Sequence, residues 1–352
     1  MSTDLHDPLR DALAAGKTPG ELGFFMPAET APHAACWMAW PHDDHPESWG
    51  RTLPDVQATM VNVARAISAF EPVRVVVHPE EVPVARAALP AHVDIVALDQ
   101  DDLWFRDTGP LFLGNGAGGR IAGRMRFNSW GGKFPIEGDA TVAGALIDHL
   151  NLPRFDSPLT GEGGGLHTDG AGTVITTETF LLNPNRNPGL SRKDAEEQLF
   201  HLMGARKVIW LPGDEDEWIT DGHIDGILTF VAPGKVIFET NPDPENPRHA
   251  VTHDNLRALQ GQTDAAGRDI EIIEISEAYD VEPLSDVMAT SYVNSYIANG
   301  GIVMPEFGVA TDKAAQDVFA RAFPDRKIAT VDLMKIAPGG GGIHCITQQQ
   351  PL

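Results

Sequence analysis

The sequence has few basic residues for its length. Its 352 residues include 26 Lys and Arg against 50 Asp and Glu, which gives a formal net charge of −24. A chain this acidic repels phosphate backbones and anionic lipid surfaces, so we expect it to bind neither nucleic acid nor membranes. It also lacks an apolar run long enough to cross a bilayer. With 42% hydrophobic and 22% charged residues, its composition is that of a globular protein rather than a disordered one.

Cysteine is scarce as well. The two cysteines, Cys36 and Cys345, stand near opposite ends of the chain. A protein of this size does not require one long disulfide, so we expect reduced thiols, of which one is present for its reactivity. Residues 1–20 contain no apolar segment typical of a secretory leader. Both features favour a cytoplasmic protein.

No Ser/Gly-rich linker divides the chain, and its 35 Gly and 27 Pro indicate many turns between short segments. Alternating apolar runs predict strands at 36–40, 73–78, 93–98, 121–127, 173–182, 208–211, 226–231, 235–239, 270–275, 292–298, 301–304 and 328–333. Helical periodicity predicts helices near 53–70, 79–89, 140–150, 192–204, 253–259 and 312–323. The clearest of these follows Ser191 as N-cap, has Asp194 at the capping-box position and ends at Gly204.

The order of these segments predicts the fold class. Residues 226–240 are expected to form a strand, a Pro-Gly turn and a second strand, followed by a helix and another strand. Residues 291–333 repeat this plan around an Asn-Gly-Gly turn. A doubly wound sheet would alternate one strand with one helix. A hairpin before each helix instead indicates α/β modules of ββαβ type, each of about 70 residues and five in all, arranged as a propeller. We therefore expect residues 1–352 to form a single domain.

Four short segments contain groups that can do chemistry. Residues 101–110 combine three carboxylates with Trp104 and Arg106 before a Gly-Pro turn, although Arg106 and Asp107 could equally form a structural ion pair. Residues 161–165 surround Glu162 with glycines, which suits either a flexible loop or close approach of a ligand. The acidic run 214–217 is not one of the four segments, because it lacks the spacing of a calcium-binding loop and is interpreted as a solvated loop.

Residues 220–226 form the third segment. If they lead into the strand at 226–231, His223 and Asp225 project to the same side. The pair suits a general base beside a carboxylate, or a histidine that local hydrogen bonds satisfy. We expect no metal, because the chain offers no further ligands at zinc spacing.

The fourth segment, residues 338–350, places Cys345 after four glycines and beside His344. An exposed loop there would let the thiol ionise, whereas Cys36 has no such neighbours and is expected in the core. A thiol, a histidine and several carboxylates together suit covalent catalysis on a cation. A cysteine protease has no use for a pocket of carboxylates, but a planar guanidinium is held by paired hydrogen bonds to them. The sequence thus predicts a guanidine-modifying site.

The same residues carry a family resemblance over nearly the whole chain. The chain resembles the agmatine deiminases, in the bacterial peptidylarginine-deiminase-type branch of the guanidine-modifying (pentein) superfamily. The matching runs are 26–29, 37–41, 102–110, 127–132, 162–164, 182–188, 220–225 and 339–351, of which the last is highly specific. The resemblance implies a five-bladed α/β propeller with the active site at its centre.

The resemblance also implies roles for individual residues. The nucleophile falls on Cys345 and the acid/base histidine on His223, while Asp107 and Asp225 bind the guanidinium. The expected substrate-binding residues are Glu162, Trp104 and Asp221. In the implied mechanism, which needs no metal or cofactor, the thiolate attacks the guanidinium carbon, ammonia leaves, and water releases a ureido product. For agmatine that product is N-carbamoylputrescine.

The sequence does not decide which guanidine compound is the substrate. Residues 213–219 are more acidic than the resemblance leads us to expect, so their carboxylates could bind the distal amine of agmatine or indicate another cationic guanidine. Arg106 and Arg186 are the candidates to bind an α-carboxylate, which would favour free or peptidyl arginine. The same residue types would also suit an amidinotransferase or a catalytically silent guanidine-binding protein, although the intact set of site residues argues against silence. We expect a homo-oligomer whose number of subunits the sequence does not fix.

Overall fold

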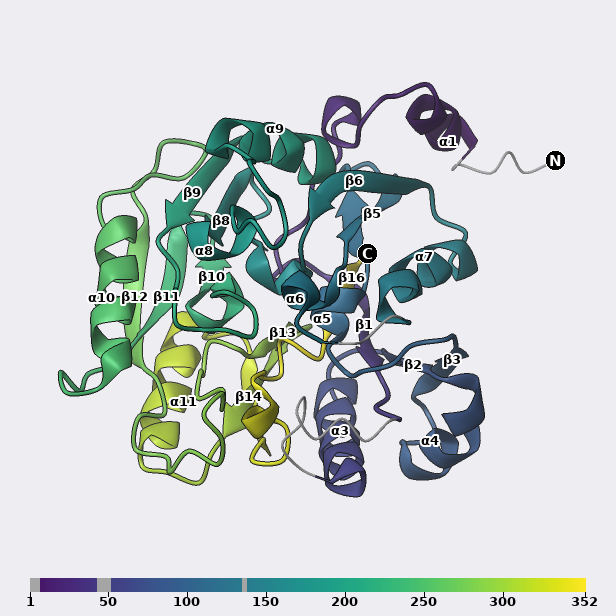
Figure 1. Ribbon diagram of the computed structural model, residues 1–352. Helices are drawn as coiled ribbons and strands as arrows, with labels where there is room; N and C mark the ends of the chain where they lie inside the picture. Colours follow the sequence, from purple (N-terminus) through teal and green to yellow (C-terminus); the bar gives the residue numbers. More distant parts are fainter. Residues whose placement is uncertain (1–6, 43–51, 135–137) are drawn as a thin grey trace.

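A computed structural model describes residues 7–42, 52–134 and 138–352. Five small sheets surround a common centre, and the long helices lie around the outside of the ring (Figure 1). This is the five-bladed α/β propeller that the sequence predicted. Its blades are ββαβ modules in which the first two strands are antiparallel and the third runs parallel to the second.

Four blades follow one another along the chain. Their strands are β4 (Leu111–Gly114), β5 (Arg120–Arg126) and β6 (Arg154–Thr160); β7 (His167–Thr168), β8 (Thr173–Thr177) and β9 (Lys207–Leu211); β10 (Leu228–Ala232), β11 (Lys235–Thr240) and β12 (Glu271–Ser276); and β13 (Tyr296–Ala298), β14 (Gly301–Glu306) and β15 (Lys327–Asp332). The first strands of these blades begin less than 70 residues apart, so the modules are somewhat shorter than expected.

One long helix joins the second strand of each blade to the third. These crossover helices are α7 (Asp139–His149), α9 (Arg192–Met203), α10 (Pro247–Leu259) and α11 (Thr311–Ala322). Helix α9 has the predicted ends: the Ser191 side chain accepts a hydrogen bond from the Asp194 amide, and Gly204 ends the helix at φ +71°. These helices also pack against the preceding blade: α9 contacts β5 and β6, α10 contacts β11 and β9, and α11 contacts β15 and β12.

The fifth blade joins the two ends of the chain. It contains β16 (Gln348–Pro351), β1 (His33–Ala39), β2 (Val73–Val77) and β3 (Asp94–Ala97), in that order across the sheet. Helices α3 (Leu53–Ser68) and α4 (Val82–Ala88) connect its parallel strands. The C-terminal strand β16 pairs antiparallel with β1, and the Trp37 indole donates to Gln350 Oε1 at 2.9 Å. This pairing closes the ring.

Several sequence predictions need correction. Thr173–Leu182 is not one strand, because β8 ends at Thr177 and the short helix α8 (Glu178–Leu181) follows. In the predicted strand Tyr292–Ala298, only β13 is a strand, and residues 292–295 form a turn. Strands β4, β6, β7 and β16 were not predicted. The remaining helices are α1 (Asp7–Ala14), α5 (Phe105–Thr108) and α6 (Ser129–Gly132).

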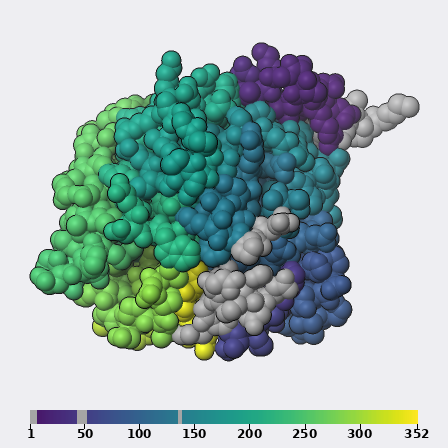
Figure 2. Space-filling model, in the orientation of Figure 1, coloured from purple at the N-terminus to yellow at the C-terminus, as the bar shows by residue number. Residues whose placement is uncertain are grey.

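The cores of the blades and the centre of the ring are buried. Cys36 is 0% exposed in the core cluster that includes α3, α11 and the fifth blade, as its apolar surroundings predicted. Little of the yellow C-terminal segment reaches the face shown in Figure 2, and most of residues 336–350 are buried. Within the described residues, no helix is both long enough and apolar enough to span a bilayer.

Candidate active site

The candidate site is built from five turns that occupy equivalent places in the five blades. Each turn ends a few residues before the first strand of its blade, that is, before β4, β7, β10, β13 and β16. The polar residues that these turns bring to the centre are Asp107, Glu162, His223 and Asp225, Asn294, and Cys345. The repeated architecture therefore gathers one chemical group or more from every blade.

Gly164 lies at the meeting point of three of these groups. A Cβ at this position would stand 2.7 Å from His223 Nδ1, 2.8 Å from Asp107 Oδ1 and 2.9 Å from Asp225 Oδ2. Real side-chain contacts are longer than this, so only glycine lets a histidine and two carboxylates approach so closely. The glycine-rich segment 161–165 thus acts as a packing centre of the site.

The Cys345 thiol lies at the edge of this cluster. Its Sγ is 3.1 Å from Asn294 Nδ2 and 3.5 Å from Asp225 Oδ2, and its backbone amide donates to Asn294 Oδ1 at 3.2 Å. The residue is partly exposed, unlike Cys36. Burial, together with the charges of Asp225 and Asp107, raises the pKa of the Cys345 thiol well above its usual value. In the free protein the sulfur is therefore a thiol, and a cation is needed to stabilise the thiolate.

His223 stands between two carboxylates. Its Nε2 is 3.1 Å from Glu162 Oε2, and its Nδ1 is 3.8 Å from Asp107 Oδ1. Burial opposes the protonated ring, but Asp107, Glu162 and Asp225 together raise the pKa of His223 to about 8. At neutral pH the ring is therefore an imidazolium that can donate a proton. His223 and Asp225 belong to a 3₁₀ turn at 223–226, not to the predicted strand, which begins only at Leu228.

Asp107 and Asp225 have opposite titration behaviour. Asp107 accepts hydrogen bonds from the Gly164 amide and the Trp130 indole, each at 2.9 Å. Burial raises the pKa of Asp107 to about 6, with His223 acting against this effect and Asp225 adding to it. Burial also acts on Asp225, but the hydrogen bond and charge of His344 hold the pKa of Asp225 below its usual value. Both carboxylates are ionised at neutral pH.

Behind Asp225 lies a buried chain of ionic groups. His344 Nδ1 is 2.8 Å from Asp225 Oδ2, and its Nε2 is 2.7 Å from Glu29 Oε1. Arg106 also pairs with Glu29, at 3.3 Å, and donates to the His344 carbonyl. From the sequence, His344 was expected to activate Cys345, and an Arg106–Asp107 ion pair was left open. The structure instead directs both cations to other carboxylates.

Glu162 and Asp221 are engaged within the protein. Glu162 is 0% exposed and, besides His223, binds Arg186 Nε through both oxygens at 3.1 and 2.9 Å. Asp221 binds Arg186, Lys133 Nζ at 2.6 Å and the Asn185 amide. Neither carboxylate lines the two compartments that meet at Cys345. Their expected direct contact with substrate stays a prediction, whereas their observed contacts hold His223 and the turn before it.

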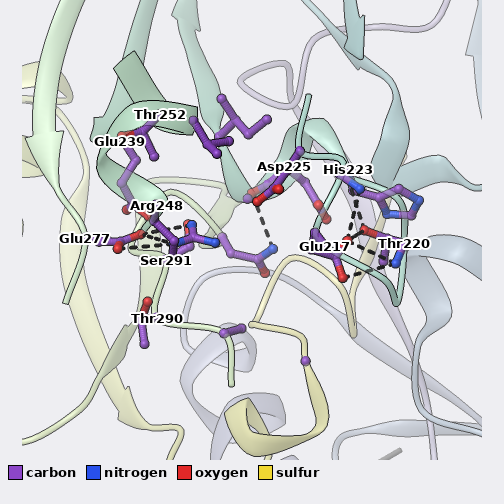
Figure 3. Close-up of a pocket in the computed structure, with 18 of the residues that line it drawn as sticks. Glu217, Thr220, His223, Asp225, Glu239, Arg248, Thr252, Glu277, Thr290 and Ser291 are labelled. Atoms are coloured by element: carbon purple, nitrogen blue, oxygen red, sulfur yellow. Dashed lines mark hydrogen bonds and ion pairs between the residues drawn. The ribbon is translucent and has the colours of Figure 1, made fainter. Parts of the chain in front are cut away.

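Two compartments meet at Cys345. The larger, of about 900 Å³ including its open mouth, is lined by His223 and Asp225 near the thiol and by Glu239, Arg248 and Glu277 farther away. Figure 3 shows these two groups at opposite ends of the pocket. The smaller compartment has aromatic walls from Trp104, Trp130 and Phe134, together with Asp107 and Ile219. Trp104 therefore lies where a substrate bound at the thiol would meet it.

The acidic segment 214–217 is only partly at the pocket. Asp214 and Glu217 line the larger compartment, whereas Glu215 and Asp216 are exposed and do not. Glu217 accepts hydrogen bonds from the backbone amides of Ile219, Thr220 and Gly222 and from the Thr220 hydroxyl. Its oxygens therefore shape the turn that carries His223. Among the described residues, no cluster of His, Cys, Asp and Glu has the arrangement of a metal site.

Sequence reasoning missed two residues of the site. Asn294 binds both the thiol and the amide of Cys345, but it fell within the expected strand 292–298. Trp130 binds Asp107 from a turn in which Ser129, Trp130 and Gly131 all have positive φ, and it was noted only within the run 127–132. For Asn294 the usable signal is the equivalence of the blades, because it precedes β13 as Cys345 precedes β16.

Comparison with known proteins shows one family over nearly the whole chain. Residues 25–351 match the model of Porphyromonas-type peptidyl-arginine deiminases. A Streptomyces coelicolor protein, provisionally named an agmatine deiminase, is 41% identical over 94% of this chain and 99% of its own length. The agmatine deiminase of Pseudomonas fluorescens is 38% identical over 95% of this chain and 97% of its own length.

A solved structure gives the same result. The agmatine deiminase of Enterococcus faecalis, in a structure described as catalysing its reaction, superposes with a TM-score of 0.91 at 34% identity. The match covers 96% of this chain and 98% of the other. The similarity therefore extends to all five blades and to the turns that form the site.

Proposed function

The chain belongs to the family of Porphyromonas-type peptidyl-arginine deiminases, and on that premise we propose that it hydrolyses agmatine to N-carbamoylputrescine and ammonia. The observation that carries the proposal is the arrangement of the Cys345 thiol beside Asp225, with Asp107 and His223 meeting around Gly164. We further propose that residues 1–352 act as one catalytic domain.

The two aspartates would hold the guanidinium. Each presents oxygens around the same small space, and a planar guanidinium satisfies paired carboxylates through its fixed fork of N–H groups. The bound cation would also offset the negative charges that keep Cys345 protonated. Binding of substrate would thus generate the thiolate nucleophile, with the thiol proton released to solvent, whereas without a bound cation the sulfur would stay an unreactive thiol.

The reaction would then proceed in two halves. Cys345 Sγ forms a bond to the guanidinium carbon, and His223 donates its proton to the departing nitrogen, so that ammonia leaves and a thiouronium-like adduct stays on the sulfur. In the second half, neutral His223 removes a proton from water, whose oxygen bonds to the same carbon. The C–S bond breaks with its electron pair going to the sulfur, the remaining hydroxyl proton passes to that sulfur and restores the thiol, and the neutral ureido product leaves. Asn294, which donates to the sulfur, would stabilise it in both halves.

Several contacts favour agmatine over arginine. Arg106 and Arg186, the candidates to bind an α-carboxylate, are buried in ion pairs with Glu29 and with Glu162 and Asp221. Arg248 lines the larger compartment, but Glu277 pairs with it at 2.9 Å. A substrate whose tail carries a cation instead of a carboxylate suits this acidic pocket. The competing functions are deimination of free or peptidyl arginine, and transfer of the amidino group to an amine instead of water.

A direct assay separates these functions. The protein would be incubated with agmatine, arginine or a blocked arginine peptide, and ureido product and ammonia would be measured. We expect product from agmatine at a kcat/KM far above those of the other two. Formation of no ureido product from any of the three would refute the proposal. An amidinated acceptor amine formed in place of ammonia would indicate the transferase.

We also propose a cytoplasmic location and a homo-oligomeric assembly. The free thiols of Cys36 and Cys345 agree with a reducing compartment. Sedimentation at several protein concentrations would decide the oligomeric state, and a monomer at all of them would refute that part of the proposal.

A further inference from the structure

We propose that Glu239, with the Ser291 hydroxyl, forms the subsite that binds the distal ammonium group of the substrate. This inference rests on the proposed function and extends it from the reacting guanidinium to the other end of the substrate. Glu239 belongs to β11 and Ser291 to the turn before β13, and both line the larger compartment together with Cys345 (Figure 3).

Glu239 has an acceptor oxygen that the protein does not use. The residue is 2% exposed, and its Oε2 accepts hydrogen bonds from the amides of Tyr292 and Val293 at 2.7 and 3.2 Å. Its Oε1 has no partner at ordinary hydrogen-bond geometry, and neither has Ser291 Oγ, although this hydroxyl lies close enough to the Glu239 carboxylate to lower its pKa. Buried polar atoms without partners are rare and costly. An ammonium group, which has three donors and no acceptor, would satisfy the carboxylate and the hydroxyl together.

The other two glutamates that line the larger compartment, Glu277 near Glu239 and Glu217 near His223, are already engaged (Figure 3). Glu277 pairs with Arg248 and accepts a hydrogen bond from the Asn241 amide at 2.5 Å. Glu217 accepts four donors from its own turn. Because Glu277 pairs with Arg248, Glu239 is the buried carboxylate at that end of the pocket whose second oxygen has no hydrogen-bond partner, and it supplies the negative charge for a ligand once it is ionised.

The short segment 292–294 connects Glu239 to the thiol. Glu239 binds the amides of Tyr292 and Val293, and the next residue, Asn294, contacts Cys345 Sγ. The Cα atoms of Tyr292 and Asn294 are two residues apart and so lie at most about 7.6 Å from each other. In extended agmatine six bonds separate the guanidinium carbon from the terminal nitrogen, a span of roughly 7.5 Å. Because Glu239 and Cys345 also line the same compartment, we infer that the two ends of the substrate face these two groups.

The ionisation of Glu239 is also consistent with binding of an ammonium group. Burial, with the charge of Glu277 in addition, raises the pKa of Glu239 to about 8 in the free protein. A bound ammonium group favours the ionised carboxylate and would supply the missing partner of Oε1. A ligand with a neutral or anionic tail would leave that oxygen unsatisfied, so the subsite discriminates by charge.

The test compares agmatine with n-pentylguanidine, in which a methyl group replaces the ammonium. For the unmodified protein we expect kcat/KM for agmatine to exceed that for pentylguanidine at least about tenfold, as for a hydrogen bond to a charged group. Glu239→Gln should lower kcat/KM for agmatine by at least about tenfold, mainly through KM, and leave pentylguanidine within about twofold. Ser291→Ala should lower it a few-fold. Glu215→Gln, an exposed acid outside the pocket, serves as the matched control and should change neither substrate.

Three results would overturn the inference. An equal loss for both guanidines would mean that Glu239 only holds the turn at residues 291–294. No loss for agmatine would place the tail elsewhere, such as in the aromatic compartment of Trp104, Trp130 and Phe134. Arginine turning over faster than agmatine, with Glu239→Gln without effect, would assign the pocket to an α-carboxylate.

Failure of the proposed function would look different. If the unmodified protein converts neither guanidine, the proposed activity is wrong, and binding still decides the subsite. Titration calorimetry with Cys345→Ser, which keeps the pocket but cannot form the adduct, would compare the affinities of agmatine and pentylguanidine with and without Glu239→Gln. A preference for agmatine that Glu239→Gln removes supports the subsite, and an unchanged preference refutes it.

Discussion

At the scale of single residues, the site depends on how closely charged groups can approach. Gly164 has no side chain, so the ring of His223 and the carboxylates of Asp107 and Asp225 share the space that a Cβ would occupy. Burial raises the pKa of Asp107 to about 6, with Asp225 adding to this effect and His223 opposing it, whereas the nearby carboxylates outweigh burial and raise the pKa of His223 to about 8. Catalytic groups titrating near the working pH are those that proton transfer requires.

Gly164→Ala tests this packing directly. The added methyl group would force at least one of the three side chains to move, and a displacement of this kind costs about 100-fold or more in kcat/KM. Circular dichroism should show an unchanged fold. Gly114→Ala is the control, because its Cβ would meet Pro27 at an ordinary 3.8 Å. Wild-type kinetics for Gly164→Ala would contradict the assigned geometry.

The pH dependence follows from the same pair. Asp107 must be ionised to bind the guanidinium, so activity should be lost as the pH falls through about 6. His223 must be protonated to release ammonia, so activity should also be lost as the pH rises through about 8. The profile of kcat/KM is best measured with pentylguanidine, which does not involve Glu239. The range from about pH 5 to about pH 9 extends roughly one pH unit beyond each of the two pKa values. A kcat/KM that stays constant over this range would contradict the roles of Asp107 and His223.

At the scale of elements, each blade contributes through the turn before its first strand. Apolar residues make β1, β2, β5, β9, β11, β12 and β14 visible in the sequence, because a strand with a buried face carries apolar residues at alternate positions and one covered on both faces carries them nearly throughout. Strand β16 is not visible, because Gln348-Gln349-Gln350 has no apolar alternation. Its conformation is set by pairing with β1, more than 300 residues away, which local sequence does not report.

The residues of the site, like the strands, could be predicted from the sequence only in part. The thiol, the histidine and the two aspartates stand in short motifs, and the structure brings them together. Glu162 and Asp221 also stand in motifs, but their partner Arg186 was considered only as a candidate to bind an α-carboxylate of the substrate, and the structure pairs it with these two acids instead. Composition reveals which groups are available, whereas the choice among possible partners is made by tertiary packing.

Closure of the ring by β16 leads to a stability prediction. Gln350 Oε1 accepts hydrogen bonds from the Trp37 indole at 2.9 Å and from Arg74 at 3.1 Å. Gln350→Ala leaves the buried indole donor without a partner, which should lower the free energy of unfolding by about 1–3 kcal/mol. Urea titration followed by tryptophan fluorescence would measure the loss. Gln260→Ala, at the end of α10, should have little effect, and an equal loss there would argue against the role of the closure.

At the scale of the whole molecule, the formal net charge of −24 belongs to a protein whose proposed substrate is a cation. A field of this sign raises the local concentration of a small dication and speeds its encounter with the site. Screening limits that field to about 8 Å at physiological ionic strength. The acidic composition that argues against nucleic-acid binding is therefore consistent with the proposed substrate.

Ionic strength should accordingly affect the two guanidines differently. Raising the salt concentration from about 0.01 M to about 1 M shortens the screening length from about 30 to about 3 Å. We expect kcat/KM for the dication agmatine to fall several-fold and that for the monocation pentylguanidine to fall less. An effect of equal size for both substrates, or a rise with salt, would contradict electrostatic steering.

The central claim is that Cys345 is the nucleophile of a guanidine hydrolase, and the adduct is its most direct test. The protein would be mixed with agmatine, quenched in acid within the first turnovers and analysed by mass spectrometry of the intact chain and its peptides. We predict a mass increase equal to agmatine less ammonia on the peptide that contains Cys345. The increase should be absent in Cys345→Ser and retained in Cys36→Ser, which should keep activity within several-fold. Turnover without any adduct on Cys345, or wild-type turnover by Cys345→Ser, would contradict the claim.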